Sequence, residues 1–194
     1  KYLDIGDFQL KDSYLSIGEA LNHAGAANNV GVNICWINSR DIESWNVDWS
    51  KYDGILVPGG FGSMGVEGKI LAIEYARKNN IPFLGLCYGL QMAVIEYARN
   101  VCNLNANSTE INPQIEQKVI DILESQRGID KKGGTMRLGS YPAFLLPGSK
   151  VEEIYGSNRV EERHRHRYEV NPDYHQILEE KGLSICGKSS DGTL

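Results

Sequence analysis

Residues 81–91 read IPFLGLCYGLQ, a short apolar run that ends on a cysteine between two glycines. The run has the length of a strand and the residues after it have helical spacing, so we predict a strand, a sharp turn and a helix. The backbone of such a turn is strained, and a nucleophile on it needs small neighbours, which Gly85 and Gly89 supply. The N-terminus of the helix would also favour the thiolate form of Cys87.

A second interpretation of this stretch stays open. A buried structural cysteine between two packing glycines would show the same Gly-x-Cys-x-Gly pattern. Gln91 lies four residues after Cys87 and would project over the same edge of the helix, although a glutamine on the surface is the commoner explanation. The pattern by itself does not decide between a catalytic and a core cysteine.

Length and composition indicate one globular domain. With 194 residues, the chain can bury one sizeable core and is short for two generous domains, so we expect a single domain over residues 1–194. The hydrophobic share of 41% and the charged share of 23% are ordinary, and no apolar run approaches the roughly 18 residues of a membrane span. The net charge of -5 argues against a general nucleic-acid binder.

The cysteines indicate a reducing compartment. The sequence shows no signal peptide, and the cysteines are widely spaced without a Cys-x-x-Cys pair: Cys35, Cys87, Cys102 and Cys186. We therefore expect a cytoplasmic protein. The chain opens on Lys1 without an initiator methionine, which suggests a domain excised from a longer polypeptide.

The first hundred residues alternate apolar runs with stretches of helical spacing. Strands are expected at residues 2–5, 30–37, 54–57 and 81–86, and helices at 14–27, at 66–79 and from 88 onward. Strand, helix and strand in this order predict right-handed crossovers. The expected fold class is α/β in three layers, with a central, mostly parallel sheet and helices on both faces.

A glycine-rich loop follows the expected strand at 54–57. Residues 58–62 read PGGFG, and their three glycines free the backbone and leave N–H groups open to an anion. The loop lacks the Gly-Lys-Ser/Thr ending of a P-loop and does not match the dinucleotide fingerprint, so neither nucleotide site is predicted. A plain tight turn is the alternative that the glycines alone leave open.

The second half of the chain is less regular. Residues 103–110 are polar and turn-rich, 119–122 have the composition of a strand, and 125–134 form a charged loop that we expect to be a mobile flap. Short strands and turns over 135–148 suggest a small antiparallel addition to the parallel core. A helix is expected at 172–181 and a last strand at 183–186.

Residues 161–170 read EERHRHRYEV. In an extended strand, alternation would place Arg163, Arg165 and Arg167 on one face and His164, His166 and Tyr168 on the other. The His-x-His pair has no third ligand nearby in the sequence, so no metal site is predicted. The arginine row is consistent either with a solvated face or with bidentate binding of a carboxylate or phosphate.

Several motifs resemble a known family. PGGFG at 58–62, GLCYGLQ at 85–91 and the spacing between them resemble the class I glutamine amidotransferases. NANSTE at 105–110, GGTMRLG at 133–139 and ERHRHRYEV at 162–170 resemble the glutaminase domains of CTP synthases in particular. The resemblance covers essentially the whole chain.

The resemblance implies a reaction and a set of residues. Cys87 would attack the side-chain amide of glutamine and form a thioester, with the oxyanion between the backbone N–H groups of Gly60 and Tyr88. The ammonia would serve a synthase domain of the same polypeptide, a ligase of pyrimidine biosynthesis that converts UTP to CTP with ATP and Mg. The implied glutamine-binding residues are Gly59, Gly60, Phe61, Tyr88, Gly89, Leu90, Gln91, Glu110, Arg167 and Tyr168.

Other expectations come from the same resemblance. Thr135 and Arg137 match a lid motif associated with activation by GTP, the domain itself carries no cofactor, and the parent protein is a homo-oligomer. The family completes its triad with a His-Pro-Glu motif, expected here after Leu194, so no histidine of the chain is assigned as the base. The alternatives are another class I amidotransferase and a catalytically silent domain that binds glutamine or a nucleotide.

Overall fold

The computed structural model describes residues 2–4, 14–44, 47–122, 136–190 and 192. These residues cluster into two compact units, residues 1–96 and 97–194, and the division falls inside one helix. The expectation of a single domain stays a prediction.

The first unit contains a four-stranded parallel sheet. Its strands are β1 (Tyr2–Asp4), β2 (Ile34–Trp36), β3 (Gly54–Val57) and β4 (Phe83–Gly85), in the order β2-β1-β3-β4. The four expected strands are therefore present. β2 is shorter than residues 30–37 because the N–H of Val30 donates to Gly25 O at 2.9 Å, which closes the end of the preceding helix.

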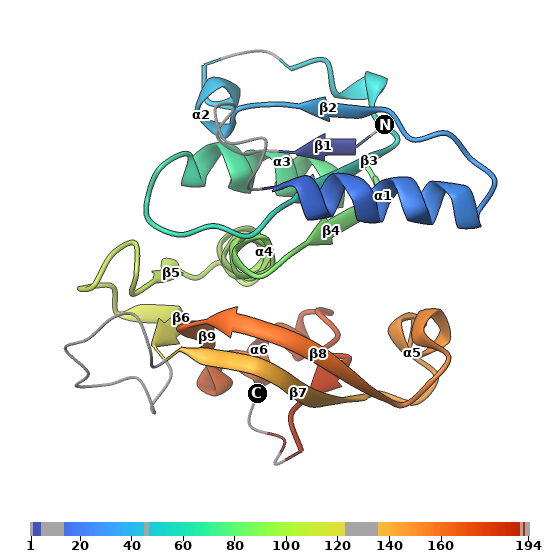
Figure 1. Cartoon of the computed structure of the whole chain (residues 1–194). Coiled ribbons are helices and arrows are strands. Elements are labelled where there is room, and N and C mark those ends of the chain that lie inside the picture. Colours follow the sequence, from blue (N-terminus) through green and yellow to red (C-terminus); the bar gives the residue numbers. More distant parts are fainter. Residues whose placement is uncertain (1, 5–13, 45–46, 123–135, 191, 193–194) are drawn as a thin grey trace. The chain divides into compact units, whose positions relative to one another are not determined.

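Helices lie on both faces of this sheet. In the sheet order, β2 lies on one side of β1 and β4 lies on the opposite side of β3, so the β1–β2 and β3–β4 connections run in opposite directions across the sheet. Right-handed crossovers then put α1 (Leu15–Ala27) and α3 (Val66–Lys78) on opposite faces (Figure 1). The predicted three-layer α/β fold is confirmed. The remaining elements of this part of the chain are α2 (Ser39–Ile42), the short 3-10 helix η2 (Trp49–Lys51) and α4 (Tyr88–Asn100).

The core of the first unit centres on β3. Every residue of β3 is buried, which explains why its sequence is a continuous apolar run instead of an alternating one. Side chains from α3 and α4 complete this core: Ile70, Ile73, Ala76, Met92, Val94 and Ile95. The strand that leads to the glycine loop is thus packed on both faces.

The second unit contains two three-stranded sheets. One has the order β5-β6-β9 and consists of β5 (Ala106–Ser108), β6 (Gln117–Ile122) and β9 (Tyr168–Val170), with β9 antiparallel to β6. The other has the order β10-β7-β8, is antiparallel, and consists of β7 (Arg137–Leu145), β8 (Arg159–His166) and β10 (Gly187–Lys188) (Figure 1). The helical segments are α5 (Lys150–Tyr155), the 3-10 helix η4 (Pro172–Tyr174) and α6 (His175–Glu180). The expected antiparallel addition is present.

Two details of the second unit differ from the expectations. The last strand is not at residues 183–186 but at 187–188, because Cys186 O accepts a bond from the N–H of Leu146 at 2.7 Å and β10 pairs with β7 only after it. The helix expected at 172–181 begins as a 3-10 turn whose cap is the side chain of Asn171. The flap expected at 125–134 lies outside the described residues.

A buried ion pair joins α3 to α4. The carboxylate of Glu96 is 1% exposed and receives three hydrogen bonds from Arg77, of which the shorter two are 2.9 Å from Nε to Oε2 and 2.6 Å from Nη2 to Oε1. Both oxygens of this buried charge are therefore satisfied by one guanidinium.

We predict that Arg77→Met lowers the free energy of unfolding by about 3 kcal/mol, because it leaves the buried charge of Glu96 uncompensated. Urea denaturation followed by circular dichroism measures this. Lys78→Met is the matched control, since Lys78 is exposed on the same helix and its pair with the half-buried Glu74 should contribute under about 0.5 kcal/mol. Equal losses in the two variants would contradict the prediction.

Candidate active site

The predicted sharp turn is present at Cys87. β4 ends at Gly85 and α4 begins at Tyr88, and between them Cys87 has a φ of 51°. A side chain other than glycine rarely adopts this left-handed conformation, which costs strain energy. The N–H of Leu86 donates to Val57 O at 2.9 Å and the N–H of Gly89 donates to Leu86 O at 2.9 Å. These bonds hold the turn on both sides of the cysteine.

The two glycines of the turn are required by close packing. A Cβ on Gly85 would lie 2.7 Å from the carbonyl carbon of Gly89, and a Cβ on Gly89 would lie 2.0 Å from Val57 O. Neither distance leaves room for a methyl group. The Gly-x-Cys-x-Gly spacing is therefore a consequence of the start of helix α4 meeting the backbones of both β3 and β4.

Cys87 is exposed, which contradicts the interpretation of this residue as a buried core cysteine. Cys102 is the buried cysteine, and burial raises the pKa of its thiol. Cys35 and Cys186 are half-buried. Because α4 begins directly after Cys87, this thiol is attached at the positive end of the helix dipole.

The glycine loop lies beside the turn. A Cβ on Gly59 would lie 3.8 Å from Cβ of Cys87, and a Cβ on Gly60 would lie 3.6 Å from Cδ1 of Tyr88. The loop backbone thus lies beside Cys87, the predicted nucleophile, and places Gly60 next to Tyr88, the other predicted oxyanion donor. Phe61 extends into solvent and is 87% exposed.

Helix α4 presents two further predicted residues. Gln91 is only 6% exposed, so the interpretation as a surface glutamine is wrong. Its N–H donates to Cys87 O at 3.1 Å, in the first turn of the helix. Leu90, in contrast, is 49% exposed. The burial of Gln91 depends on packing around α4 and has no signal in the local sequence.

In the second unit, three predicted glutamine-binding residues come together. Burial and the charge of Glu110 raise the pKa of Tyr168, while the charge of Arg167 lowers it, so both charged groups act on this hydroxyl. The N–H of Glu110 donates to the side chain of Ser108 at 3.1 Å, which fixes the turn after β5. All three residues are half-buried.

The arginine row predicted for 163–167 is interrupted. Arg163 and Arg165 are exposed on β8, but β8 ends at His166, and Arg167 is the half-buried residue between β8 and β9. The break also changes which residues share a face. In an uninterrupted strand, Glu169 would lie on the same face as the three arginines. Instead it contacts His166.

Glu169 is a partner that the sequence analysis missed. Its Oε2 lies 3.5 Å from Nη1 of Arg137 and 3.4 Å from Nδ1 of His166. The guanidinium of Arg137 also lies 4.7 Å from the ring centroid of Tyr141. The pairing of residue 137 with residue 166 in the β7–β8 ladder brings these groups together. Thr135, the other lid residue of the prediction, lies outside the described residues.

Two histidines continue this cluster. Nδ1 of His166 lies 3.1 Å from Tyr168 O, and its Nε2 lies 2.9 Å from Nδ1 of His164. Since a carbonyl only accepts, Nδ1 of His166 carries the proton, its Nε2 accepts, and Nδ1 of His164 donates. Burial and the charge of Arg137 lower the pKa of His164, and burial lowers the pKa of His166. In the part of the chain that the structure describes, no group of three His, Cys, Asp or Glu side chains could hold a metal ion.

The comparisons with known proteins agree with this geometry. The profile of the family described as glutamine amidotransferase class-I matches residues 9–194. The chain belongs to the class I glutamine amidotransferase family. It is 58% identical over 194 residues to CTP synthase from Methanococcus maripaludis and 59% identical over 195 residues to CTP synthase from Methanocaldococcus jannaschii. Each alignment covers 96% of this chain and 36% of the relative, so the chain spans about a third of their length.

Solved structures of amidotransferases have the same fold. The glutaminase domain of Trypanosoma brucei CTPS with bound acivicin superposes with a TM-score of 0.88 at 38% identity, over 97% of this chain and 74% of that chain. A glutamine amidotransferase from Thermotoga maritima, at 13% identity and a TM-score of 0.52, supports the fold alone. The resemblance to CTP synthase glutaminase domains is confirmed for this amidotransferase chain.

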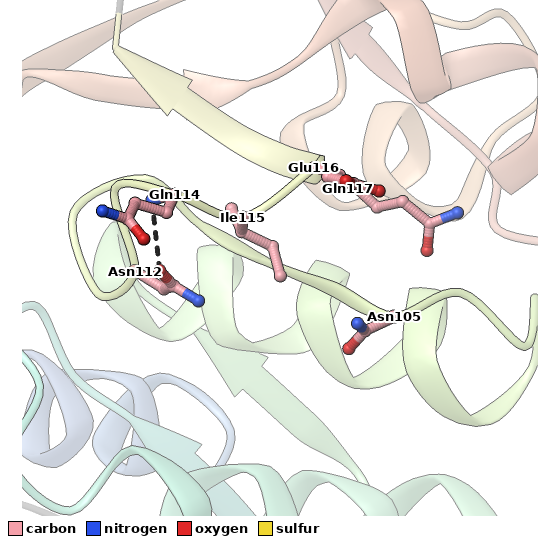
Figure 2. Close-up of a pocket in the computed structure, with 6 residues that line it drawn as sticks. All are labelled: Asn105, Asn112, Gln114, Ile115, Glu116 and Gln117. Atoms are coloured by element: carbon pink, nitrogen blue, oxygen red, sulfur yellow. Dashed lines mark hydrogen bonds between the residues drawn. The ribbon is translucent and has the colours of Figure 1, made fainter.

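The described surface also has a polar cleft apart from the predicted residues. Figure 2 shows it between the segment before β5 and the segment before β6, lined by Asn105, Asn112, Gln114, Ile115, Glu116 and Gln117. None of the predicted catalytic or glutamine-binding residues contributes to this lining. Separately, none of the helices in the described ranges combines the length and apolarity needed to span a membrane.

We predict that the stability of the protein falls as the pH drops below about 6.5, the ordinary pKa of histidine. The lowered pKa of His166 means that the unfolded chain binds its proton more readily than the folded chain. This source of stability is therefore present above pH 6.5 and is lost as the pH falls through the folded pKa. Burial raises the pKa of Glu169, which makes the folded protein more stable as the pH falls. A variant of His166 is therefore needed to separate its contribution from that of Glu169.

The measurement is the free energy of unfolding from urea titrations between pH 7.5 and pH 5. His166→Asn should lose less stability over this interval than the wild type. His23→Asn, at a histidine exposed on α1, is the matched substitution with which the His166→Asn profile is compared. A His166→Asn profile parallel to that of the wild type would refute the assignment.

Proposed function

We propose that this domain hydrolyses glutamine through Cys87 and supplies ammonia to a synthase domain that aminates UTP to CTP. The observation that carries the proposal is the exposed Cys87 in a left-handed conformation between β4 and α4, with the glycine loop against it. A strained, exposed nucleophile at the start of a helix is the arrangement that acyl transfer requires.

The chemistry follows from these groups. The thiolate of Cys87 attacks the amide carbon of the glutamine side chain, and the amide oxygen becomes an oxyanion that the N–H groups of Gly60 and Tyr88 stabilise. The C–N bond then breaks and ammonia leaves with one added proton. Water attacks the thioester, which releases glutamate and regenerates the thiol. The proton transfers require a general acid–base group, the role that the family gives to its His-Pro-Glu motif.

Other residues bind the ends of the substrate. We assign the carboxylate of glutamine to Arg167, whose guanidinium suits a planar anion, and its ammonium group to Glu110. Gly59, Phe61, Leu90 and Gln91 line the path of the side chain. Gly89 and Tyr168 complete the proposed set of glutamine-binding residues.

Regulation and context belong to the same proposal. Thr135 and Arg137 form a lid that responds to GTP, and ATP and Mg act in the synthase domain. The contact of Arg137 with Glu169 and Tyr141 gives the lid residue a defined position before GTP binds. We place the parent protein in the cytoplasm as a homo-oligomer that acts in pyrimidine biosynthesis.

Cys87→Ser in the complete natural polypeptide should lower glutamine-dependent ammonia release and CTP formation by at least about 1,000-fold, because serine is not activated in this setting. CTP formation from free ammonia should stay near the wild-type rate. An electrophilic glutamine analogue should label Cys87 before the other three cysteines in peptide mapping, and Cys186→Ser should leave both activities unchanged. Full glutamine-dependent activity in Cys87→Ser would exclude the proposed function.

Arg167→Ala should raise the KM for glutamine by about 10- to 100-fold, as expected for the loss of a charge-assisted bond worth roughly 1.5 to 3 kcal/mol. Ammonia-dependent CTP formation should remain near normal. Arg163→Ala is the matched control, since this arginine is exposed on β8. A parallel loss of both activities in Arg167→Ala would make Arg167 a structural residue instead.

A further inference from the structure

The glycine loop continues through Gly65, and among the apolar side chains of residues 58–65 only that of Pro58 is buried. Phe61 is 87% exposed and Met64 is 68% exposed, so neither side chain anchors the loop in the core. Gly62 and Gly65 have φ values of 79° and 62°, a region that glycine enters easily. Ordering such a segment costs much conformational entropy. From Gly59 to Met64 no residue is buried, so something other than apolar packing must fix this part of the backbone.

Tyr88 is one of the groups that hold the loop. Its ring is 2% exposed, and its hydroxyl donates a hydrogen bond to Gly62 O. The same ring lies 3.6 Å from where a Cβ on Gly60 would be. The residue that contributes one oxyanion N–H therefore also holds, through its side chain, the loop that contributes the other.

Lys69 is the second of these groups. Its ammonium donates to Met64 O at 3.1 Å, Gly65 O at 3.3 Å and the Oγ of Ser39 at 3.2 Å. An ammonium has three N–H donors, so the three acceptors use all of them. The nitrogen also lies 5.8 Å from the centroid of the Tyr88 ring, within the range of a cation–π interaction.

We infer that the hydroxyl of Tyr88 and the ammonium of Lys69 form a clamp that holds the glycine loop, and with it the N–H of Gly60, in position for the oxyanion. This inference rests on the proposed glutaminase function. Both groups bind loop carbonyls instead of substrate, so they are positioning groups. The two groups of the clamp come from different helices, Tyr88 from α4 and Lys69 from α3.

A clamp of this kind has a specific kinetic signature. The oxyanion exists in the transition state and not in bound glutamine, so a displaced Gly60 lowers kcat while leaving KM nearly unchanged. Alkylation of Cys87 by iodoacetamide is a direct displacement of iodide and forms no oxyanion. Its rate should therefore report on the thiol alone.

The test uses Tyr88→Phe and Lys69→Met in the complete natural polypeptide. Each should lower kcat for glutamine hydrolysis by about tenfold, less than the 100- to 1,000-fold typical of losing an oxyanion donor outright. KM for glutamine and the alkylation rate of Cys87 should stay within about twofold of wild type. The double variant should lose less than the product of the two single losses, because both groups hold one loop.

Matched controls separate the clamp from general damage. Tyr97→Phe deletes a hydroxyl that also bonds a carbonyl, at 2.7 Å from Lys181 O, and Lys78→Met removes an ammonium from the same helix as Lys69. Both should retain wild-type kcat. Hydrogen exchange of the amides at 59–65 should accelerate in the clamp variants and not in these controls.

The outcomes distinguish the inference from the function it rests on. If the wild type does not hydrolyse glutamine, the proposed function is wrong. If hydrogen exchange at 59–65 is then also unchanged in the clamp variants, the clamp is wrong as well. An active wild type with unchanged kcat in both clamp variants would overturn the clamp alone. A loss of kcat matched by an equal loss of alkylation rate would also overturn it, because the defect would lie in the thiol.

Discussion

The site depends on one close backbone approach, in which the carbonyl oxygen of Val57 would lie 2.0 Å from a Cβ on residue 89. Only glycine at this position lets the end of β3 meet the start of α4. The same carbonyl accepts the N–H of Leu86 at 2.9 Å, so the parallel ladder ends there and the chain turns at Cys87. The exposure of the thiol and the nearness of the glycine loop both follow from this contact.

The turn stores strain that the surrounding core must compensate. A left-handed conformation at a residue such as Cys87 costs roughly 1 to 3 kcal/mol and persists only where its neighbours leave no alternative. β3 is buried along its whole length, and Met92 and Ile95 of α4 are fully buried. Because β4 pairs with the buried β3 and α4 is fixed by apolar packing, the two residues between β4 and α4 have little freedom to relax. Cys87 is therefore positioned by the core and not by the loop around it.

The sequence predicted the features that depend on local pattern. The parallel strands, their helices and the turn at Cys87 follow from apolar runs and from glycines at fixed spacing. The features it missed depend on partners distant in sequence. β10 lies later than expected because β7 sets its register, and Glu169 joins His166 because β8 stops before Arg167. The burial of Gln91 likewise depends on the residues that pack around α4, and the identity of residue 91 alone does not predict it.

The two halves of the proposed oxyanion site are held by different kinds of interaction. The N–H of Tyr88 belongs to a helix anchored by apolar packing, whereas the N–H of Gly60 belongs to a loop gripped through its carbonyl groups. Anchoring the loop by its own apolar side chains would turn Phe61 inward. Because the clamp binds backbone oxygens instead, Phe61 stays exposed. A polar clamp thus fixes the position of the backbone without using the side chains that the site needs.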